Sequence, residues 1–136
     1  MNTVADCKPW ALHQVQGSHD DVSAILTLPF TVQRIYYLYD VMPGATRGHH
    51  AHRKLEGVMV ASSGSFDVEL HDGKNSFVLT LSDPALGLFI PNMIWRVVRN
   101  FSTDAVCLVF ASGKFEEGEM IYDYNEFLKM KGYVNL

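Results

Sequence analysis

The segment from Gly44 to Glu56 contains the residues whose types and spacing are best suited to catalysis. It includes Arg47 and, two positions apart, His50 and His52. On a β-strand, residues two apart point to the same face of the sheet. The spacing therefore predicts two imidazoles side by side in one cavity. His49 is expected on the opposite face, as a structural or exposed residue.

Paired imidazoles near arginine and tyrosine can transfer protons. Histidine is the commonest general acid or base near neutral pH, and arginine suits a phosphate or a developing enolate oxygen. These residue types fit proton abstraction next to a carbonyl better than redox chemistry. The structural alternative is that backbone partners satisfy both histidines. It is disfavoured because burying two imidazoles beside an arginine costs free energy without a compensating function.

The same segment fits the first sequence pattern of the cupins, G-x5-H-x-H-x3,4-E-x6-G. Gly44, His50 and His52 are in register with it. Glu56 fits only if the final glycine, Gly64, lies one residue late. The pattern predicts a cupin-type arrangement of the histidines but leaves the position of the glutamate open.

Two of the four usual cupin metal-ligand positions are replaced. If the final glycine sets the register, the glutamate position falls on Gly57, which has no side chain. The second cupin pattern, G-x5-P-x-G-x2-H-x3-N, places Pro91 and Asn100 in register, with Arg96 at the histidine position. Arginine stays protonated and cannot ligate a metal, and two histidines alone make a poor metal site. The sequence predicts a site with no metal and no other cofactor.

The composition excludes several other classes of protein. The chain has 136 residues, a net charge of −4 and a pI near 5.8, which argue for one domain over 1–136 and against a nucleic-acid binder. Cys7 and Cys107 form no CxxC pair and are expected as free buried thiols in a reducing cytosol, with one disulfide between them as the alternative. The first residues do not have the pattern of a secretory signal, and no apolar run reaches about 18 residues. We expect a cytoplasmic protein that does not contact a membrane.

Short runs of β-forming residues, separated by turn residues, predict an all-β fold. Asp72-Gly73, between two alternating runs, indicates a hairpin. The near-regular spacing favours a β-sandwich or a barrel, with one short C-terminal helix at roughly Tyr122–Lys131. Together with the cupin patterns, it leads us to expect an antiparallel jelly-roll β-barrel. The predicted strands are Val22–Leu28, Phe30–Tyr39, Leu55–Ala61, Ser65–Leu70, Ser76–Leu81, Gly87–Ile90, Ile94–Val98 and Ala105–Ala111.

Six motifs together resemble those of the sugar 3,4-ketoisomerases, the WxcM-like and FdtA-like cupins. The resemblance covers the chain from about Pro29 to its end. The block R-G-x-H-A-H with W-R and the paired tyrosines makes it specific. The motifs are R-I-Y-Y-L-Y-D (34–40), R-G-x-H-A-H-x-x-L-E (47–56), D-G (72–73), G-L-F-I-P (87–91), W-R (95–96) and Y-D-Y-N-E-F (122–127).

The resemblance implies an isomerase that acts on dTDP-4-keto-6-deoxyglucose. The carbonyl would move from C4 to C3 through an enediolate, giving a dTDP-3-keto-6-deoxyhexose. A partner aminotransferase would then make a 3-amino sugar for a surface polysaccharide such as O-antigen lipopolysaccharide or for an S-layer glycan. The family is metal-free and dimeric, so a homodimer is expected.

The resemblance also implies roles for particular residues. His50 matches the catalytic histidine and His52 its neighbour. Tyr36 matches the active-site tyrosine, a candidate for proton exchange among the sugar oxygens. Arg47 matches the arginine of the motif, and Arg34 lies where a nucleotide-binding arginine is expected.

The W-R motif and two departures from the family pattern bear on the substrate pocket. Trp95 and Arg96 are assigned to substrate binding, although Trp95 is alternatively a core residue. In the family, arginine after the tryptophan accompanies the gluco product, so Arg96 favours dTDP-3-keto-6-deoxyglucose. Gly57 replaces a usual glutamine, and Gln16 stands where relatives have tyrosine or arginine in the sugar pocket.

Three other functions compete with this hypothesis. A dTDP-sugar 3,5-epimerase shares the barrel and the substrate class and is the runner-up, but its differently spaced His, Asp and Tyr motif is not found. A metal-dependent cupin, such as a dioxygenase or a phosphomannose isomerase, would need the replaced ligands. A non-catalytic sugar-nucleotide-binding cupin would need a further domain.

Overall fold

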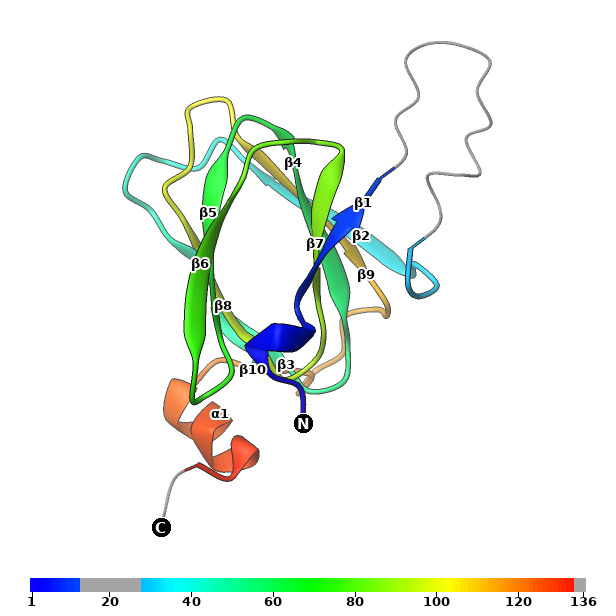
Figure 1. Cartoon of the computed structure of the whole chain (residues 1–136), viewed down its shortest axis with the longest axis vertical. Coiled ribbons are helices and arrows are strands. Elements are labelled where there is room, and N and C mark those ends of the chain that lie inside the picture. Colours follow the sequence, from blue (N-terminus) through cyan, green and yellow to red (C-terminus); the bar gives the residue numbers. More distant parts are fainter. Residues whose placement is uncertain (13–27, 134–136) are drawn as a thin grey trace.

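The computed structural model describes residues 1–12 and 28–133, and these form two antiparallel sheets and one short α-helix (Figure 1). This arrangement confirms the prediction of a nearly all-β chain that ends in a helix. The elements are the 3-10 helix η1 (Val4–Asp6), β1 (Lys8–Ala11), β2 (Arg34–Tyr39), β3 (Arg47–His52), β4 (Gly57–Ser63), β5 (Phe66–His71), β6 (Ser76–Leu81), β7 (Leu86–Ile90), β8 (Trp95–Arg99), β9 (Val106–Ala111), β10 (Met120–Ile121) and α1 (Tyr124–Lys131).

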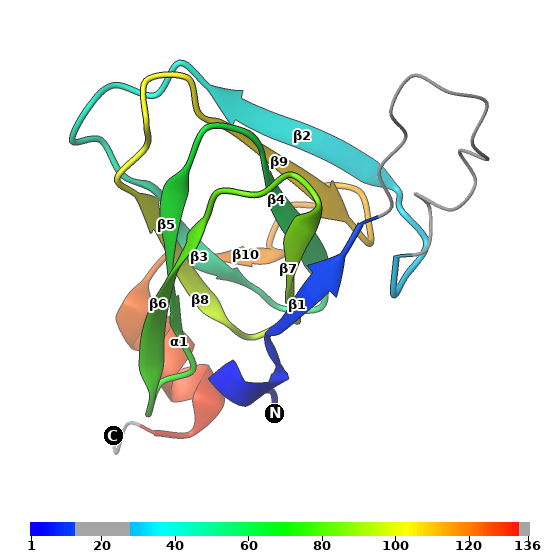
Figure 2. The ribbon, with the colours of Figure 1, turned by 45° about the horizontal axis from the view of Figure 1, so that its top comes forward.

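The two sheets have five strands each and face one another (Figure 2). The first has the strand order β1-β7-β4-β9-β2, and the second has the order β10-β3-β8-β5-β6. Neighbouring strands are mostly distant in sequence, so residues far apart along the chain meet between the sheets. The main core lies there and draws buried residues from both sheets, among them Phe66, Val68, Ile90 and Val109.

Alternating side chains place the apolar face of each strand inward. In β5, Phe66, Val68 and Leu70 are fully buried, whereas the residues between them are half-buried. The hairpin predicted at Asp72-Gly73 joins β5 to β6. The Asp72 carboxylate accepts hydrogen bonds from the backbone N–H groups of Lys74 and Asn75, which fixes the turn.

The predicted element boundaries differ from the structure in several places. The helix begins at Tyr124 rather than Tyr122, because Asp123 is the N-cap and accepts hydrogen bonds from two following backbone N–H groups. Three strands are absent from the predicted set: the short β1 and β10, and β3, which the spacing of the histidines presupposed without bounds. The predicted strand Val22–Leu28 lies outside the described residues except for its last residue.

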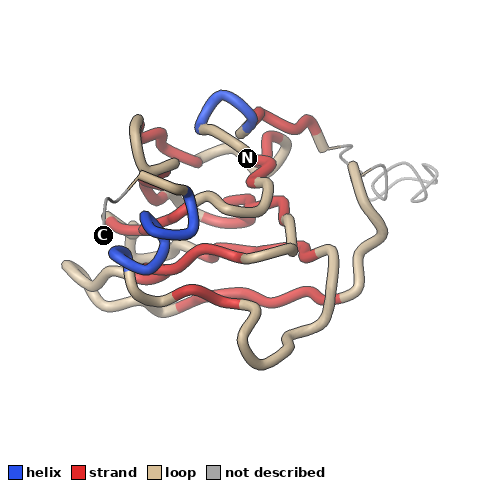
Figure 3. The backbone as a smooth tube through the Cα atoms, turned by 90° about the horizontal axis from the view of Figure 1, so that it is seen from below, coloured by secondary structure: helices blue, strands red, loops and turns tan. Residues whose placement is uncertain are grey.

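A second, smaller core attaches α1 to the outer side of the second sheet. Phe127 of the helix is fully buried and belongs to one apolar cluster with Ala51, Trp95 and Ile121. Seen from below, both helical segments lie at the outside of the strand layers (Figure 3). Within the described ranges, no helix is long and apolar enough to cross a membrane.

Candidate active site

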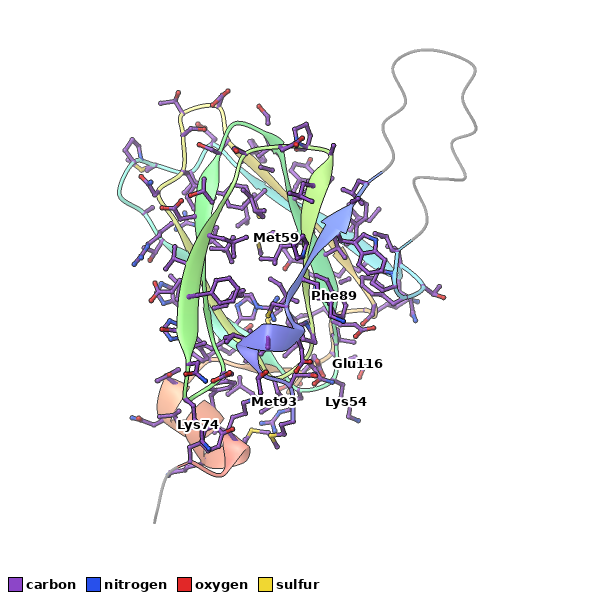
Figure 4. All side chains as sticks on the ribbon, viewed as in Figure 1. Lys54, Met59, Lys74, Phe89, Met93 and Glu116 are labelled. Carbon is purple, nitrogen blue, oxygen red and sulfur yellow. The ribbon has the colours of Figure 1, made fainter. Side chains whose placement is uncertain are left out.

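A cavity of about 140 Å³ lies between the two sheets. Strands β2, β4 and β9 of the first sheet form one wall, and β3, β8 and β10 of the second sheet form the other. Figure 4 shows Met59, one of the apolar lining residues, between the sheets. The lining residues are Arg34, Tyr36, Leu38, Arg47, Gly48, His50, Met59, Arg96, Val98, Cys107, Val109 and Met120.

A β-bulge in β3 brings Arg47 and His50 to the same side of the sheet. Arg47 pairs with Val98 of β8 and His50 pairs with Arg96, so one extra residue is accommodated between them. Gly48 and His49 have φ values of +90° and +51°, and the His49 side chain points outward to Thr46. Directly paired residues point to the same face of a sheet, and Val98 and Arg96 both face the cavity. The bulge therefore lets Arg47 and His50, three positions apart, face the same cavity.

His50 presents an unpaired nitrogen in the active-site cavity. Its Nδ1 lies 2.9 Å from the Gly48 carbonyl oxygen, which can only accept, so Nδ1 carries the proton and donates it. Its Nε2 is buried and has no hydrogen-bond partner among the described residues. Burial, followed by the positive charge of Arg96, lowers the pKa of His50 to about 4. The imidazole is therefore neutral at pH 7, and its free lone pair suits a general base.

His52 lies beside His50, as the spacing predicts, but unlike His50 it is not among the residues that line the cavity. The two rings meet edge to face with centroids 5.1 Å apart. His52 is 8% exposed, and its Nδ1 lies 3.7 Å from an Oε1 atom of Glu119. Burial, followed by the charge of Arg96 and then by His50, lowers the pKa of His52 to about 2. Both histidines are therefore neutral at pH 7.

Arg96 places a buried guanidinium in the cavity wall. It is 3% exposed, and its Nη2 donates a hydrogen bond to the Ile94 carbonyl over 3.2 Å. Its Nε–H has no partner within the described parts of the chain. Buried donors without partners are rare, and burial lowers the pKa of this group. A negatively charged oxygen of a ligand would complete the site.

Tyr36 and Arg34 come from β2 in the opposite wall, and Arg47 comes from β3. The Arg34 guanidinium lies over the Tyr36 ring at 4.7 Å and near Phe115 at 5.6 Å. Burial raises the pKa of Tyr36, with Arg96 opposing, so its phenol stays protonated at neutral pH. Arg47 is exposed and donates to the Thr46 carbonyl. The cavity thus combines a base, a phenol and three guanidinium groups.

Two residues predicted for substrate binding are not placed in this cavity. Trp95 precedes Arg96 on β8 and so points to the other face, where its ring contacts Tyr124 at 5.2 Å and Phe127 at 5.8 Å. With 6% of its surface exposed, it packs between the sheet and α1 rather than lining the cavity. Gln16 lies outside the described residues.

The donor set around the histidines does not favour a metal ion. Across residues 1–12 and 28–133, no group of three or more His, Cys, Asp and Glu side chains could hold one. The Arg96 charge acts on both imidazoles and would repel a cation there. At Gly57, an added Cβ would lie 3.1 Å from the Phe110 carbonyl, so the position has little room for the usual ligand side chain.

Sequence reasoning missed several residues that shape the site. The apolar lining, including Leu38, Met59 and Cys107, follows from the alternation in β2, β4 and β9. Met120 and Glu119 come from β10 and the turn before it, and no sequence pattern marks a strand of two residues. These two residues reach the site only because β10 pairs with β3.

The fold and site agree with what the chain is similar to. A curated protein from Aneurinibacillus thermoaerophilus, TDP-4-oxo-6-deoxy-alpha-D-glucose-3,4-oxoisomerase, is 39% identical over 121 residues, covering 89% of this chain and 87% of its own. A 3,4-ketoisomerase structure from Helicobacter canadensis is 40% identical, with a TM-score of 0.81 over 93% of this chain and 98% of its own.

A third relative has a bound sugar nucleotide. A variant of the 3,4-ketoisomerase QdtA from Thermoanaerobacterium thermosaccharolyticum, in complex with TDP-4-keto-6-deoxyglucose, is 27% identical, with a TM-score of 0.82 over 93% of this chain and 94% of its own. The family model FdtA, described as WxcM-like, C-terminal, matches residues 6–132. The chain belongs to this FdtA family, and the enzymes it resembles are isomerases.

Proposed function

We propose that this protein is a metal-independent 3,4-ketoisomerase that converts TDP-4-keto-6-deoxyglucose to a TDP-3-keto-6-deoxyhexose. The observation that supports this most directly is the buried, unpartnered Nε2 of His50 in a cavity that also holds the Arg96 guanidinium. A base beside a fixed positive charge fits proton removal next to a ketone. The product would be the substrate of an aminotransferase in 3-amino-3,6-dideoxyhexose biosynthesis.

The proposed mechanism follows from the positions of the side chains. His50 Nε2 removes the proton from C3, and the electrons move into an enediolate whose oxygens carry the negative charge. Arg96 stabilises that charge because its guanidinium is buried where water cannot screen it. The protonated Tyr36 phenol exchanges protons with the two sugar oxygens, and His50 returns a proton to C4.

The remaining arginines suit the nucleotide. Arg34 and Arg47 lie at the cavity, and Arg47 is exposed. Guanidinium groups bind phosphate oxygens in pairs of hydrogen bonds. We assign both residues to the diphosphate. Arg96 in the inner wall would hold the sugar so that C4 is protonated on the face that gives the gluco product.

The proposed assembly is a homodimer of single jelly-roll domains, each closed as a cupin barrel around its site. On the edge strand β2, Ile35, Tyr37 and Tyr39 are 58%, 60% and 65% exposed and lie on the outer face. Leu108 and Phe110 of β9 pair with β2 on that face and extend it. A contiguous apolar face of this kind marks an interaction site, and a second copy would cover both it and the strand edge.

Nuclear magnetic resonance (NMR) of the sugar nucleotide incubated with the protein tests this function. We expect the ketone to move from C4 to C3, with the same rate after dialysis against EDTA. Retention of the C4 ketone with exchange of the protons at C3 and C5 would indicate a 3,5-epimerase instead. Loss of activity on chelation, restored by one metal ion per chain, would overturn the metal-independent mechanism.

A further inference from the structure

A half-buried carboxylate lies beside His52, the second histidine of the pair. Glu119 precedes β10, and its side chain is 10% exposed. One oxygen, Oε1, accepts hydrogen bonds from the backbone N–H groups of Lys54 and Leu55, over 2.9 and 2.8 Å. The same oxygen lies 3.7 Å from Nδ1 of His52. Glu119 thus contacts the loop that leaves β3 and faces the second histidine.

One ring nitrogen of His52, on the side that faces Glu119, lacks a hydrogen-bond partner among the described residues. His52 Nδ1 is buried and has no hydrogen-bond partner among the described residues. A separation of 3.7 Å is an ion-pair distance and exceeds a hydrogen bond of about 2.7–3.2 Å. The backbones are fixed, because Met120 pairs with His52 and the Arg53 N–H donates to the Glu119 carbonyl. Because two backbone N–H groups already hold Glu119 Oε1, a hydrogen bond from His52 would require the imidazole to turn towards it.

We infer that Glu119 is a positioning residue for His52: its carboxylate holds that imidazole in the Nδ1–H tautomer and offsets positive charge at the histidine pair during turnover. The inference rests on the proposed function, because the charge to be offset arises when His50 takes the substrate proton. A carboxylate behind a histidine fixes its tautomer and raises its basicity in many sites.

The charges facing His52 explain why such a group is needed. Arg96 from β8, Arg34 from β2 and His50 from β3 all oppose a positive charge on His52. When His50 becomes an imidazolium, a cation forms about one ring away, at a centroid distance of 5.1 Å. The Glu119 carboxylate is a negative group 3.7 Å from Nδ1 of His52. It lowers the free energy of the protonated pair and so of the enediolate state.

Glutamine separates the charge of Glu119 from its role in holding the loop. In Glu119→Gln, the amide oxygen still accepts the hydrogen bonds of Lys54 and Leu55, so the loop keeps its partners. Only the negative charge is lost. Glu116, on the same turn, is exposed and lines the same outer groove as Glu119, Lys54 and Lys114. Glu116→Gln therefore removes an equal charge nearby and is the matched control.

The test measures conversion of TDP-4-keto-6-deoxyglucose as a function of pH for the three proteins. We expect Glu119→Gln to lower kcat by about 10–100-fold with little change in KM. Losing the carboxylate disfavours the protonated histidines, so the acid limb of the kcat/KM profile moves to lower pH. Glu116→Gln should match the wild type. A folded Glu119→Gln with wild-type kcat and acid limb would show that Glu119 only holds the loop, and would overturn the inference.

A second measurement does not depend on activity. In the wild-type protein, ¹⁵N chemical shifts of the histidine rings report which nitrogen carries the proton. We expect His52 as the Nδ1–H tautomer. If the wild type does not move the ketone, the proposed function fails, and the ¹⁵N result still decides the positioning of His52. Finding His52 as the Nε2–H tautomer would overturn the inference whatever the kinetics show.

Discussion

At the scale of single residues, the site depends on histidines kept neutral by their surroundings. Burial and the Arg96 charge both disfavour the imidazolium form of His50 and His52. Sequence reasoning placed the two imidazoles together from their spacing alone. The sequence could not predict the protonation state of these imidazoles, because burial and the distance to Arg96 are properties of the folded chain.

The first prediction concerns the pH dependence of activity. A base works only when unprotonated, and its folded-state pKa of about 4 lies below the ordinary imidazole value of 6.5. The kcat/KM of the free enzyme should therefore stay level as the pH falls through 6.5 and should decline only towards pH 4. A steady-state profile from pH 4 to 8 checks this. An acid limb centred at 6.5 would contradict it.

The lowered pKa of His50 also makes the free energy of unfolding depend on pH. In the unfolded chain His50 binds a proton below 6.5, whereas in the folded protein it stays neutral to about 4. The unfolded state then binds more protons in this window, so the stability that His50 contributes is present above 6.5 and is lost as the pH falls towards 4.

The second prediction is that His50→Asn abolishes turnover without unfolding the protein. Asparagine can keep a hydrogen bond to the Gly48 carbonyl but cannot take a proton. Loss of a general base costs about 10²–10⁴ in rate. Single-turnover kinetics and binding of TDP by calorimetry check this. Near-normal turnover by the variant would remove His50 from its assigned role.

At the scale of elements, the β-bulge in β3 determines which side chains enter the cavity. Strict alternation from His50 would have sent Arg47 to the outer face, but the extra residue at His49 reverses it. Trp95, which the motif assigned to the pocket with a core position as the alternative, lies outside the cavity, because β8 alternates regularly and Arg96 takes the inner position. Strand alternation and the Asp72-Gly73 hairpin were predictable, whereas the bulge and the two-residue β10 depend on pairing between distant segments.

The third prediction tests the bulge with two glycines. Gly48 has φ of +90°, and a Cβ there would lie 2.9 Å from the Arg96 carbonyl oxygen. Gly44 has φ of +82° with nothing within 4 Å of the added Cβ. Gly44→Ala should cost about 1–2 kcal/mol from backbone strain alone. Gly48→Ala should cost at least about 1 kcal/mol more and should also lower kcat, because the clash displaces the strands that hold His50 and Arg96.

Urea denaturation of both variants measures the difference. Equal losses of stability in Gly44→Ala and Gly48→Ala, with wild-type kcat in both, would show that the close packing of the bulge against β8 does not determine the positions of His50 and Arg96.

At the scale of the whole molecule, the outer apolar face of the first sheet supports the proposed dimer. A stable interface buries about 1,200–2,000 Å², and the exposed side chains of β2 are the centre of the face we assign to it. The fourth prediction is that Tyr37→Glu gives a monomer. Val78→Glu, on the exposed edge strand β6 of the other sheet, should remain a dimer.

Light scattering at micromolar concentration reads the mass of each protein. A wild-type protein that is monomeric, or a Tyr37→Glu variant that is still dimeric, would contradict this assembly.

Movement of the ketone from C4 to C3 can be followed at a single labelled carbon atom. TDP-4-keto-6-deoxyglucose labelled with ¹³C at C4 is incubated with the protein in EDTA and observed by NMR. We expect the labelled ketone signal to be replaced by that of a carbon bearing a hydroxyl, with large H4–H5 coupling for the gluco product. Small H4 coupling would show that the assignment of Arg96 to the gluco product is wrong. A labelled carbon that remains a ketone would contradict the proposed isomerisation itself.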